Sequence, residues 1–220
     1  MKAPNFQLRN TVATLLLFAL TIPASAETWT RYQGRFGGSK VKLEGTSTLH
    51  DWTVEGKIIG GFMELESSFP LDPSTKPPAN TKLNAKVEVK IPVTSLLSTK
   101  QLMDDVMYEA LKEKQHKDIQ FQLKQITLKP NAPAGLMQFD ASGDLSIAGV
   151  MRTNSMLVTF ERLDPTRLKV KGETSVKMSD FGVKVQAPLG IPLKTGDDVK
   201  IAFEWVTAQR ADPAKAADKN

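Results

Sequence analysis

The sequence predicts an all-β protein, an antiparallel β-barrel of about eight strands with one amphipathic helix. Apolar and polar residues alternate along most of the chain, which is the pattern of strands that bury one face and expose the other. Turn-forming stretches rich in Pro, Gly and Asp separate the alternating runs. A single segment has helical spacing instead, so we expect one helix in an otherwise all-β chain.

Residues 1–26 are predicted to be a signal peptide, outside the folded domain. An apolar run follows Lys2 and Arg9 and ends in small residues that suit cleavage after Ala26. Cleavage removes two basic and no acidic side chains, so the net charge falls from +5 to +3. We therefore expect an exported protein, and no later apolar run is long enough to act as a transmembrane anchor.

The mature chain is expected to fold as one domain over residues 27–207, followed by a solvated tail over 208–220. The alternating segments that we expect to form strands are 40–44, 52–58, 62–65, 82–91, 119–124, 137–147, 156–160, 168–178 and 199–205. One apolar and one charged face indicate antiparallel, half-solvated sheets. Closure into a barrel removes the exposed edges of strands this long.

The helix is predicted over residues 98–114, where apolar side chains recur every three or four positions. Ser98 and Gln101 match a capping box at its start. Met103 and Met107 lie on the apolar side of this segment, and we expect them to pack the helix onto the barrel without binding a metal.

Composition limits the classes of partner and cofactor. The chain has no Cys, so disulfides are excluded and stability must come from an apolar core. Positive charges are interspersed with acidic ones, which argues against a nucleic-acid-binding face. Two His far apart and no H-E-x-x-H motif predict no metal site and no cofactor. The sequence is compatible with a homodimer.

Small and large residues mix on the apolar faces of the predicted strands. Ala85, Ala141, Gly143 and Gly172 fall in line with large aromatic residues such as Phe121. Small inward residues leave volume inside an eight-stranded barrel, which is wide enough for one small ligand. The alternative is that neighbouring large side chains fill this space and that the protein acts through its surface on envelope partners.

Several motifs in order resemble the YceI-like family, in the branch with an STLHDW-type signature. The resemblance spans residues 39–207, although Lys117 and the Val185-Gln186 pair stand where the family usually has Pro. The matching segments are Gly45–Trp52, Ile91–Leu96, Met103–Leu111, Ile119–Phe121, Gly143–Val150, Met178–Val183 and Gly196–Val199.

This resemblance implies a lipocalin-like barrel in the bacterial periplasm that binds a polyisoprenoid chain, such as an isoprenoid quinone or a prenyl pyrophosphate. The residues expected to line the barrel around such a lipid are Leu83, Ala85, Val87, Phe121, Leu123, Phe139, Ala141, Phe181, Phe203 and Trp205. His50, Arg152 and Lys184 are the candidates for a polar rim, the last two for a pyrophosphate.

An enzyme is not predicted, although Ser47, His50 and Asp51 lie close in the sequence. In an extended strand Ser47 and His50 are about 10 Å apart, and their side chains face opposite ways. The chain also lacks the G-x-S-x-G elbow that exposes a nucleophilic serine. We expect His50 to make a hydrogen bond at a strand end and Trp52 to pack into the barrel wall.

Overall fold

The computed structural model describes residues 28–35, 37–74, 83–129, 132–133, 135–186 and 194–210. These residues form a single closed sheet with one α-helix and two short 3-10 helices, Val93–Ser95 and Met178–Phe181. The predicted signal peptide lies outside the described residues. The strands are β1 (Trp29–Gly34), β2 (Lys40–Ser47), β3 (Trp52–Gly56), β4 (Gly60–Glu66), β5 (Ala85–Pro92), β6 (Leu96–Leu97), β7 (Asp118–Leu128), β8 (Met137–Ile147), β9 (Val150–Asp164), β10 (Arg167–Lys177) and β11 (Thr195–Gln209).

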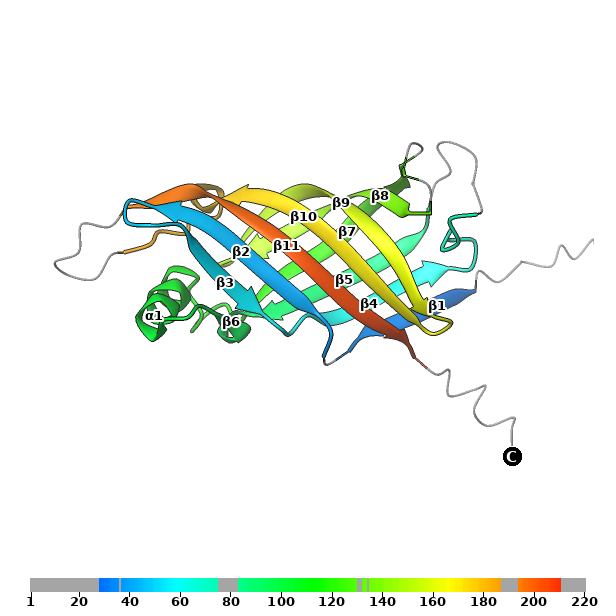
Figure 1. Cartoon of the computed structure of the whole chain (residues 1–220), viewed down its shortest axis with the longest axis horizontal. Helices are drawn as coiled ribbons and strands as arrows, with labels where there is room; N and C mark the ends of the chain where they lie inside the picture. The colour runs from blue at the N-terminus through cyan, green and yellow to red at the C-terminus, as the bar shows by residue number, and fades with distance from the viewer. Residues whose placement is uncertain are drawn as a thin grey trace, which may run out of the picture.

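All pairings between these strands are antiparallel, and they form an elongated barrel (Figure 1). The strand order is β1-β4-β5-β7-β8-β9-β10-β11-β2-β3-β6, and a further pairing between β1 and β11 closes a ring of eight strands. This confirms the predicted fold class, with three additional strands beyond the ring.

Different strands pair with β11 and complete the barrel wall at its two ends. At one end, the last residues of β11 pair with β1, from Thr207 to Gln209. Toward the other end, β11 pairs with β2 between Thr195 and Glu204, and β3 and β6 extend the wall from there. β3 and β6 share two residue pairs, one of which joins Gly56 to Leu96.

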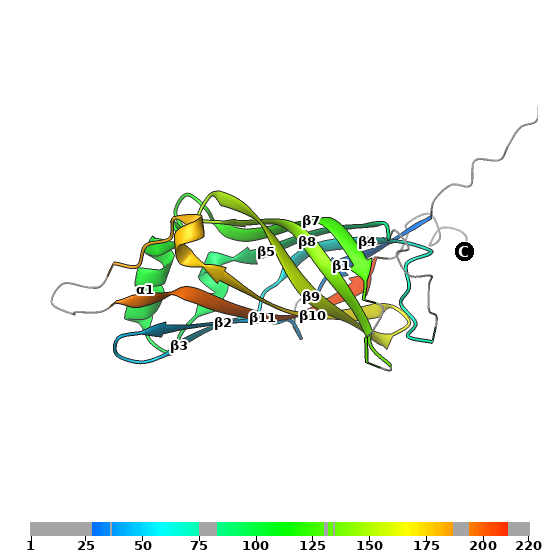
Figure 2. The same ribbon diagram turned by 90° about the horizontal axis from the view of Figure 1, so that it is seen from above.

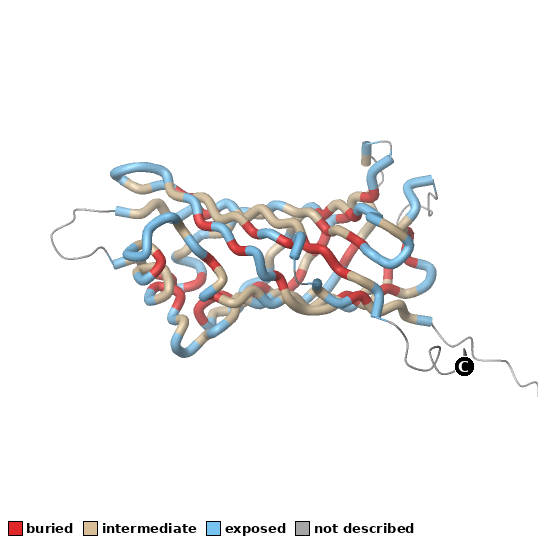
Figure 3. Tube along the Cα trace, turned by 60° about the horizontal axis from the view of Figure 1, so that its bottom comes forward, coloured by how far each residue is buried: buried red, intermediate tan, exposed pale blue. Residues whose placement is uncertain are grey.

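Alternating burial confirms the predicted inward and outward faces. In β8, every second residue from Met137 to Ile147 is buried, and the residues between them are partly or fully exposed. Figure 3 shows the same alternation as short buried and exposed segments along the strands. The outward face carries ion pairs such as Lys124–Asp144 and Lys171–Glu161, which join neighbouring strands.

The α-helix α1 spans Gln101–Ala110 and lies at one end of the barrel (Figures 1 and 2). It is shorter than the predicted 98–114, because turns with a positive φ at Lys112 follow it. The predicted capping box is wrong: the N-cap is Lys100, and no side chain caps it. Among the described residues, no helix is long and apolar enough to span a membrane.

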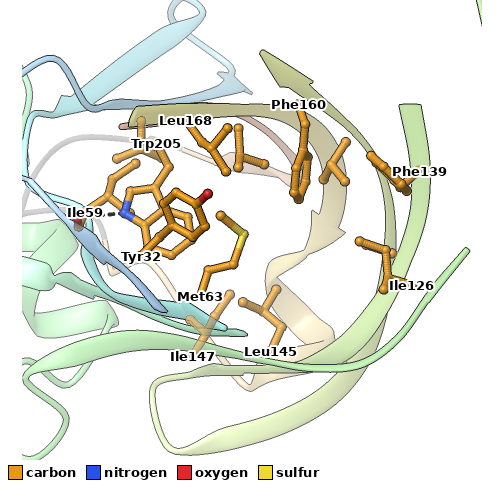
Figure 4. Close-up of a cluster of buried hydrophobic side chains, with 14 of the residues drawn as sticks. Tyr32, Ile59, Met63, Ile126, Phe139, Leu145, Ile147, Phe160, Leu168 and Trp205 are labelled. Carbon is orange, nitrogen blue, oxygen red and sulfur yellow. Dashed lines mark hydrogen bonds between the residues drawn. The ribbon is translucent and has the colours of Figure 1, made fainter. Parts of the chain in front are cut away.

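An aromatic cluster fills the barrel at the end opposite α1. The ring of Phe139 lies 5.1 Å from that of Phe69 and 4.9 Å from that of Phe160, measured between centroids. Trp205 is buried beside this cluster, and its indole Nε1 donates a hydrogen bond of 3.1 Å to the Ile59 carbonyl (Figure 4). These residues make the far end of the barrel a packed core.

One boundary and one strand differ from the sequence expectation. The solvated tail was expected from residue 208, but Ala208 and Gln209 belong to β11, where Ala208 pairs with Gln33 and Arg167. The remainder of that tail, from residue 211, lies outside the described residues. β1 was not predicted as a strand, since its buried Tyr32 lies between the polar residues Arg31 and Gln33.

Candidate functional site

The barrel contains an outer cavity at the end covered by α1. Its volume is about 310 Å³, and its lining is almost wholly apolar. Leu43 from β2, Val54 from β3 and Ile201 from β11 form one side of it. The helix covers this cavity with Leu102, Met103, Val106, Met107, Ala110 and Leu111. Met103 and Met107 thus pack α1 against the barrel as expected, and they also border empty space.

A second, inner cavity of about 120 Å³ continues from the first along the barrel. The two cavities share Leu43, Ile119 and Ile201, so they meet at these three side chains. Every residue around the inner cavity is apolar except Thr174. A polar group buried there would lose its hydration without compensation, so this space suits a hydrocarbon.

The inner cavity ends at the aromatic core. Met63, Phe160 and Trp205 border it on the side away from α1, and each is less than 10% exposed. Beyond them lie Phe69 and Phe139, which border neither cavity. The combined space is therefore a tube that opens at the helix end and stops inside the barrel.

The polar residues of the outer cavity lie at the mouth of the tube. Ser47, His50, Lys100 and Thr195 are the polar residues that line the outer cavity. His50 and Lys100 are exposed, and so is Leu49 between the β2 and β3 strands, with 63% of its surface accessible. A molecule lying in the tube can therefore keep a polar end at this rim while its apolar part is buried.

Residues 48–51 form a turn between β2 and β3 and do not continue the strand. β2 ends at Ser47, whose Oγ donates a 2.7 Å hydrogen bond to the His50 carbonyl and accepts bonds from the N–H groups of Leu49 and His50. The His50 ring lies against its neighbour, with Nδ1 2.8 Å from the Asp51 carbonyl. Trp52 then lines the outer cavity, and its Nε1 donates to the Thr46 carbonyl.

This geometry corrects the expectation of an extended stretch, since Ser47 and His50 are brought together by the turn. Their contact is nevertheless made through the main chain of His50, and the serine hydroxyl donates to a carbonyl. The imidazole is therefore not placed to accept the serine proton, as a nucleophilic mechanism requires. Among the described residues, no cluster of three His, Asp or Glu side chains could hold a metal ion.

Seven of the ten predicted lining residues border the tube. Val87, Phe121, Leu123, Ala141, Phe203 and Trp205 line the inner cavity, and Phe181 lines the outer one. The other three point to the core without reaching the tube: Leu83 is buried, Ala85 is half-buried, and Phe139 belongs to the aromatic cluster.

The three predicted rim residues are not equivalent in the structure. His50 lines the mouth. Lys184 is exposed between Val183 and Val185, which both line the outer cavity, so the lysine is near the tube without bordering it. Arg152 is exposed on β9, borders neither cavity and donates to the Met151 carbonyl. Lys100 was missed, because its position at the start of a surface helix gave no signal of a cavity below.

Comparison with known proteins agrees with this architecture. A model of the YceI-like domain family matches residues 32–207. No curated protein matches the chain.

Solved structures show the same fold at low sequence identity. Burkholderia cenocepacia BcnA aligns with a TM-score of 0.58 at 19% identity, over 79% of this chain and 98% of that one. A polyisoprenoid binding domain from Saccharophagus degradans, implicated in plant cell wall breakdown, aligns with a TM-score of 0.59 at 12% identity, over 81% and 98%. The YceI protein of Campylobacter jejuni aligns with a TM-score of 0.51 at 17% identity, over 72% of this chain and 85% of that one.

The match to the family model begins within β1 and ends two residues before the end of β11, and so covers nearly all of the barrel with its helix. It includes the seven segments on which the resemblance in the sequence rested. The chain therefore belongs to the YceI-like family.

Proposed function

We propose that this chain is a periplasmic lipid-binding protein that holds an isoprenoid chain in its barrel, as a carrier or a scavenger. The observation that carries the proposal is the apolar tube formed by the outer and inner cavities, with one open end. Each methylene of a bound chain gains about 0.8 kcal/mol on leaving water, so a long chain binds such a tube through apolar area alone.

The polar end of the lipid lies at the mouth in this proposal. Ser47, His50 and Thr195 offer hydrogen-bonding groups there, and Lys100 offers a positive charge. A quinone ring or a pyrophosphate could be received by this set. Arg152 and Lys184 remain candidates only for the outermost part of a pyrophosphate, since both are exposed outside the lining.

Family membership and one structural neighbour support the lipid as an isoprenoid. The solved domain from Saccharophagus degradans is named as polyisoprenoid-binding, and it shares the fold of this chain. The signal-like segment that precedes Ala26 in the sequence supports export to the periplasm. No cofactor besides the lipid, no metal and no nucleic acid enter the proposal, and we propose that the protein is not an enzyme.

The volume of the tube that side chains leave unfilled favours lipid binding over the alternative of a filled barrel that acts only through its surface. It also bears on the envelope-hydrolase alternative, because the Ser47 hydroxyl donates to the His50 carbonyl and not to an imidazole. If Ser47→Ala abolished turnover of an ester substrate by the purified protein, that alternative would be restored.

The test is mass spectrometry of material extracted with organic solvent from the purified native protein. We expect a prenyl lipid in wild type and its loss in Ile201→Trp, since Ile201 lies where the two cavities meet. Ile58→Trp is the matched control, because Ile58 is exposed and borders neither cavity. Circular dichroism checks that both variants fold.

The absence of prenyl lipid from wild type, together with no uptake of an added quinone, would refute the proposal. Equal lipid content in the three proteins would place the lipid outside the tube.

A further inference from the structure

Two phenylalanine rings near the junction of the cavities lie over glycines of the barrel wall. Phe203 on β11 pairs across the sheet with Gly172 on β10. A Cβ atom built on Gly172 would come within 2.5 Å of Phe203 Cζ and 2.7 Å of Cε1. Real side chains never approach so closely, so the ring occupies the space that a side chain at position 172 would need.

A similar arrangement occurs on the adjoining wall. A Cβ built on Gly143 of β8 would come within 2.3 Å of the Gln122 carbonyl oxygen and within 2.6 Å of Phe121 Cζ, both on the neighbouring strand β7. Trp52 lies over its cross-strand partner Gly45 in the outer cavity in the same way. Glycine within a strand often marks such a close approach.

The position of the two phenylalanines along the tube gives this packing a consequence. Ile119 and Ile201 border both cavities. Two residues further on each strand, Phe121 and Phe203 border the inner cavity alone. The two rings therefore stand at the entrance of the inner cavity, where a ring that turned away from its glycine would enter the passage.

We propose that the Phe203–Gly172 and Phe121–Gly143 pairs form a neck that determines how long a chain the tube accepts. This rests on the proposed function, and it concerns the length of the ligand. With both rings against the wall, the end of the chain passes the neck and occupies the inner cavity. With a ring displaced into the passage, the chain must end in the outer cavity.

The length of the inner cavity along the barrel follows from the geometry of β11. Trp205 at the end of the tube is four residues beyond Ile201, where the two cavities meet. This step is about 13 Å along the strand and about 10 Å along the barrel axis at the usual tilt. Four bonds of an extended isoprene unit span about 5 Å. The inner cavity therefore adds space for about two isoprene units.

The test replaces Gly172 by alanine and measures binding of a series of prenyl alcohols of increasing length. In wild type we expect affinity to rise with chain length up to a plateau. In Gly172→Ala the methyl group displaces the Phe203 ring, and we expect the plateau about two isoprene units earlier. The double variant Gly172→Ala/Phe203→Ala removes the displaced ring, and should return the plateau to the wild-type length.

Gly60→Ala is the matched control, because a Cβ at Gly60 would meet only the Lys90 carbonyl oxygen, at an ordinary 3.5 Å. It should leave the dependence of affinity on prenyl chain length, the length profile, unchanged. Should Gly172→Ala fail to fold, Ala141→Leu fills the inner cavity from β8 and should shorten the profile in the same way.

The outcomes separate the two proposals. If wild type binds no prenyl alcohol of any length, the proposed function is wrong, and the proposal of a neck is refuted as well. If wild type binds them and folded Gly172→Ala or Ala141→Leu keeps the wild-type length profile, the neck is refuted while the function stands. An equal loss of affinity at all lengths would likewise overturn the neck.

Discussion

At the scale of single residues, the turn between β9 and β10 depends on the carboxylate of Asp164. The Arg167 guanidinium and the Thr166 N–H, which both donate to this carboxylate, hold the pKa of Asp164 well below its usual range. A carboxyl whose pKa is lower in the folded protein contributes stability above its unfolded pKa of about 3.9, and loses that contribution as the pH falls.

We therefore expect the Asp164 carboxyl carbon to titrate below the range of the other exposed aspartates in an NMR experiment. Asp164→Asn should lower the urea midpoint at neutral pH, and this difference from wild type should shrink as the pH falls below about 4. A difference that stays constant as the pH falls well below about 4 would contradict the role of the charged carboxylate.

Residue identity also shows how far the site could be predicted from the sequence. The period-two pattern places Ala85, Phe121 and Phe139 on the inward face, and the structure agrees. Alternation states which face a residue occupies, but it carries no information about depth along the barrel. Phe121 therefore reaches the tube while Phe139 is stacked in the far core, a difference that depends on how Phe69 packs from a loop distant in sequence.

At the scale of elements, α1 is fastened to the barrel mouth by a buried carboxylate. Asp104 is 4% exposed, and its Oδ1 accepts a 2.6 Å hydrogen bond from the Ser98 N–H. Tyr108 on the same helix donates a 2.8 Å bond to the Leu96 carbonyl of β6. These two contacts tie the helix to the segment that leads into it.

We predict that Asp104→Ala lowers the free energy of unfolding by about 1.5–3 kcal/mol, the usual effect of a hydrogen bond to a charged group. Urea denaturation gives this value, and amide hydrogen exchange should show faster exchange in α1. Asp105→Ala is the control, because Asp105 is exposed and its contact with Gln101 lies at the surface. Equal effects of the two variants would show that the buried bond is unimportant.

Helical spacing was enough to predict α1, but not its ends or its place over a cavity. The sequence match of Ser98 and Gln101 to a capping box failed, because Ser98 instead forms hydrogen bonds with the main chain of Lys100 and with Asp104. An amphipathic pattern shows that one face of a helix is covered. It does not distinguish a face packed on solid core from one that borders a tube, since both need the same apolar residues.

At the scale of the whole molecule, the barrel combines a solid half with a hollow half. The far half holds the aromatic cluster with Phe139 and Phe160, and the half under α1 holds the outer cavity. Unfilled apolar volume forgoes dispersion contacts that a packed core would make. A chain that fills the tube restores those contacts and binds only the folded state.

Removal of the lipid should therefore lower the melting temperature, and adding it back should restore that temperature. A ligand at 100 times its dissociation constant stabilises by about 2.7 kcal/mol, which corresponds to a shift of about 5–10 °C for a chain of this size. Differential scanning calorimetry measures the shift. If the lipid added back is an isoprenoid quinone, the control is its quinone ring without the prenyl tail. A similar shift with that compound would show that the tail does not occupy the tube.

If the protein carries a lipid as proposed, the single opening of the tube has a consequence for lipid exchange. A chain that enters past α1 must advance with its tail leading, and it must withdraw in the reverse direction, because Trp205 and the aromatic cluster bar the other way. The head group is therefore the last part to arrive and the first to depart. Whatever delivers the lipid, and whatever receives it, must meet the protein at the same face and handle the same end of the molecule.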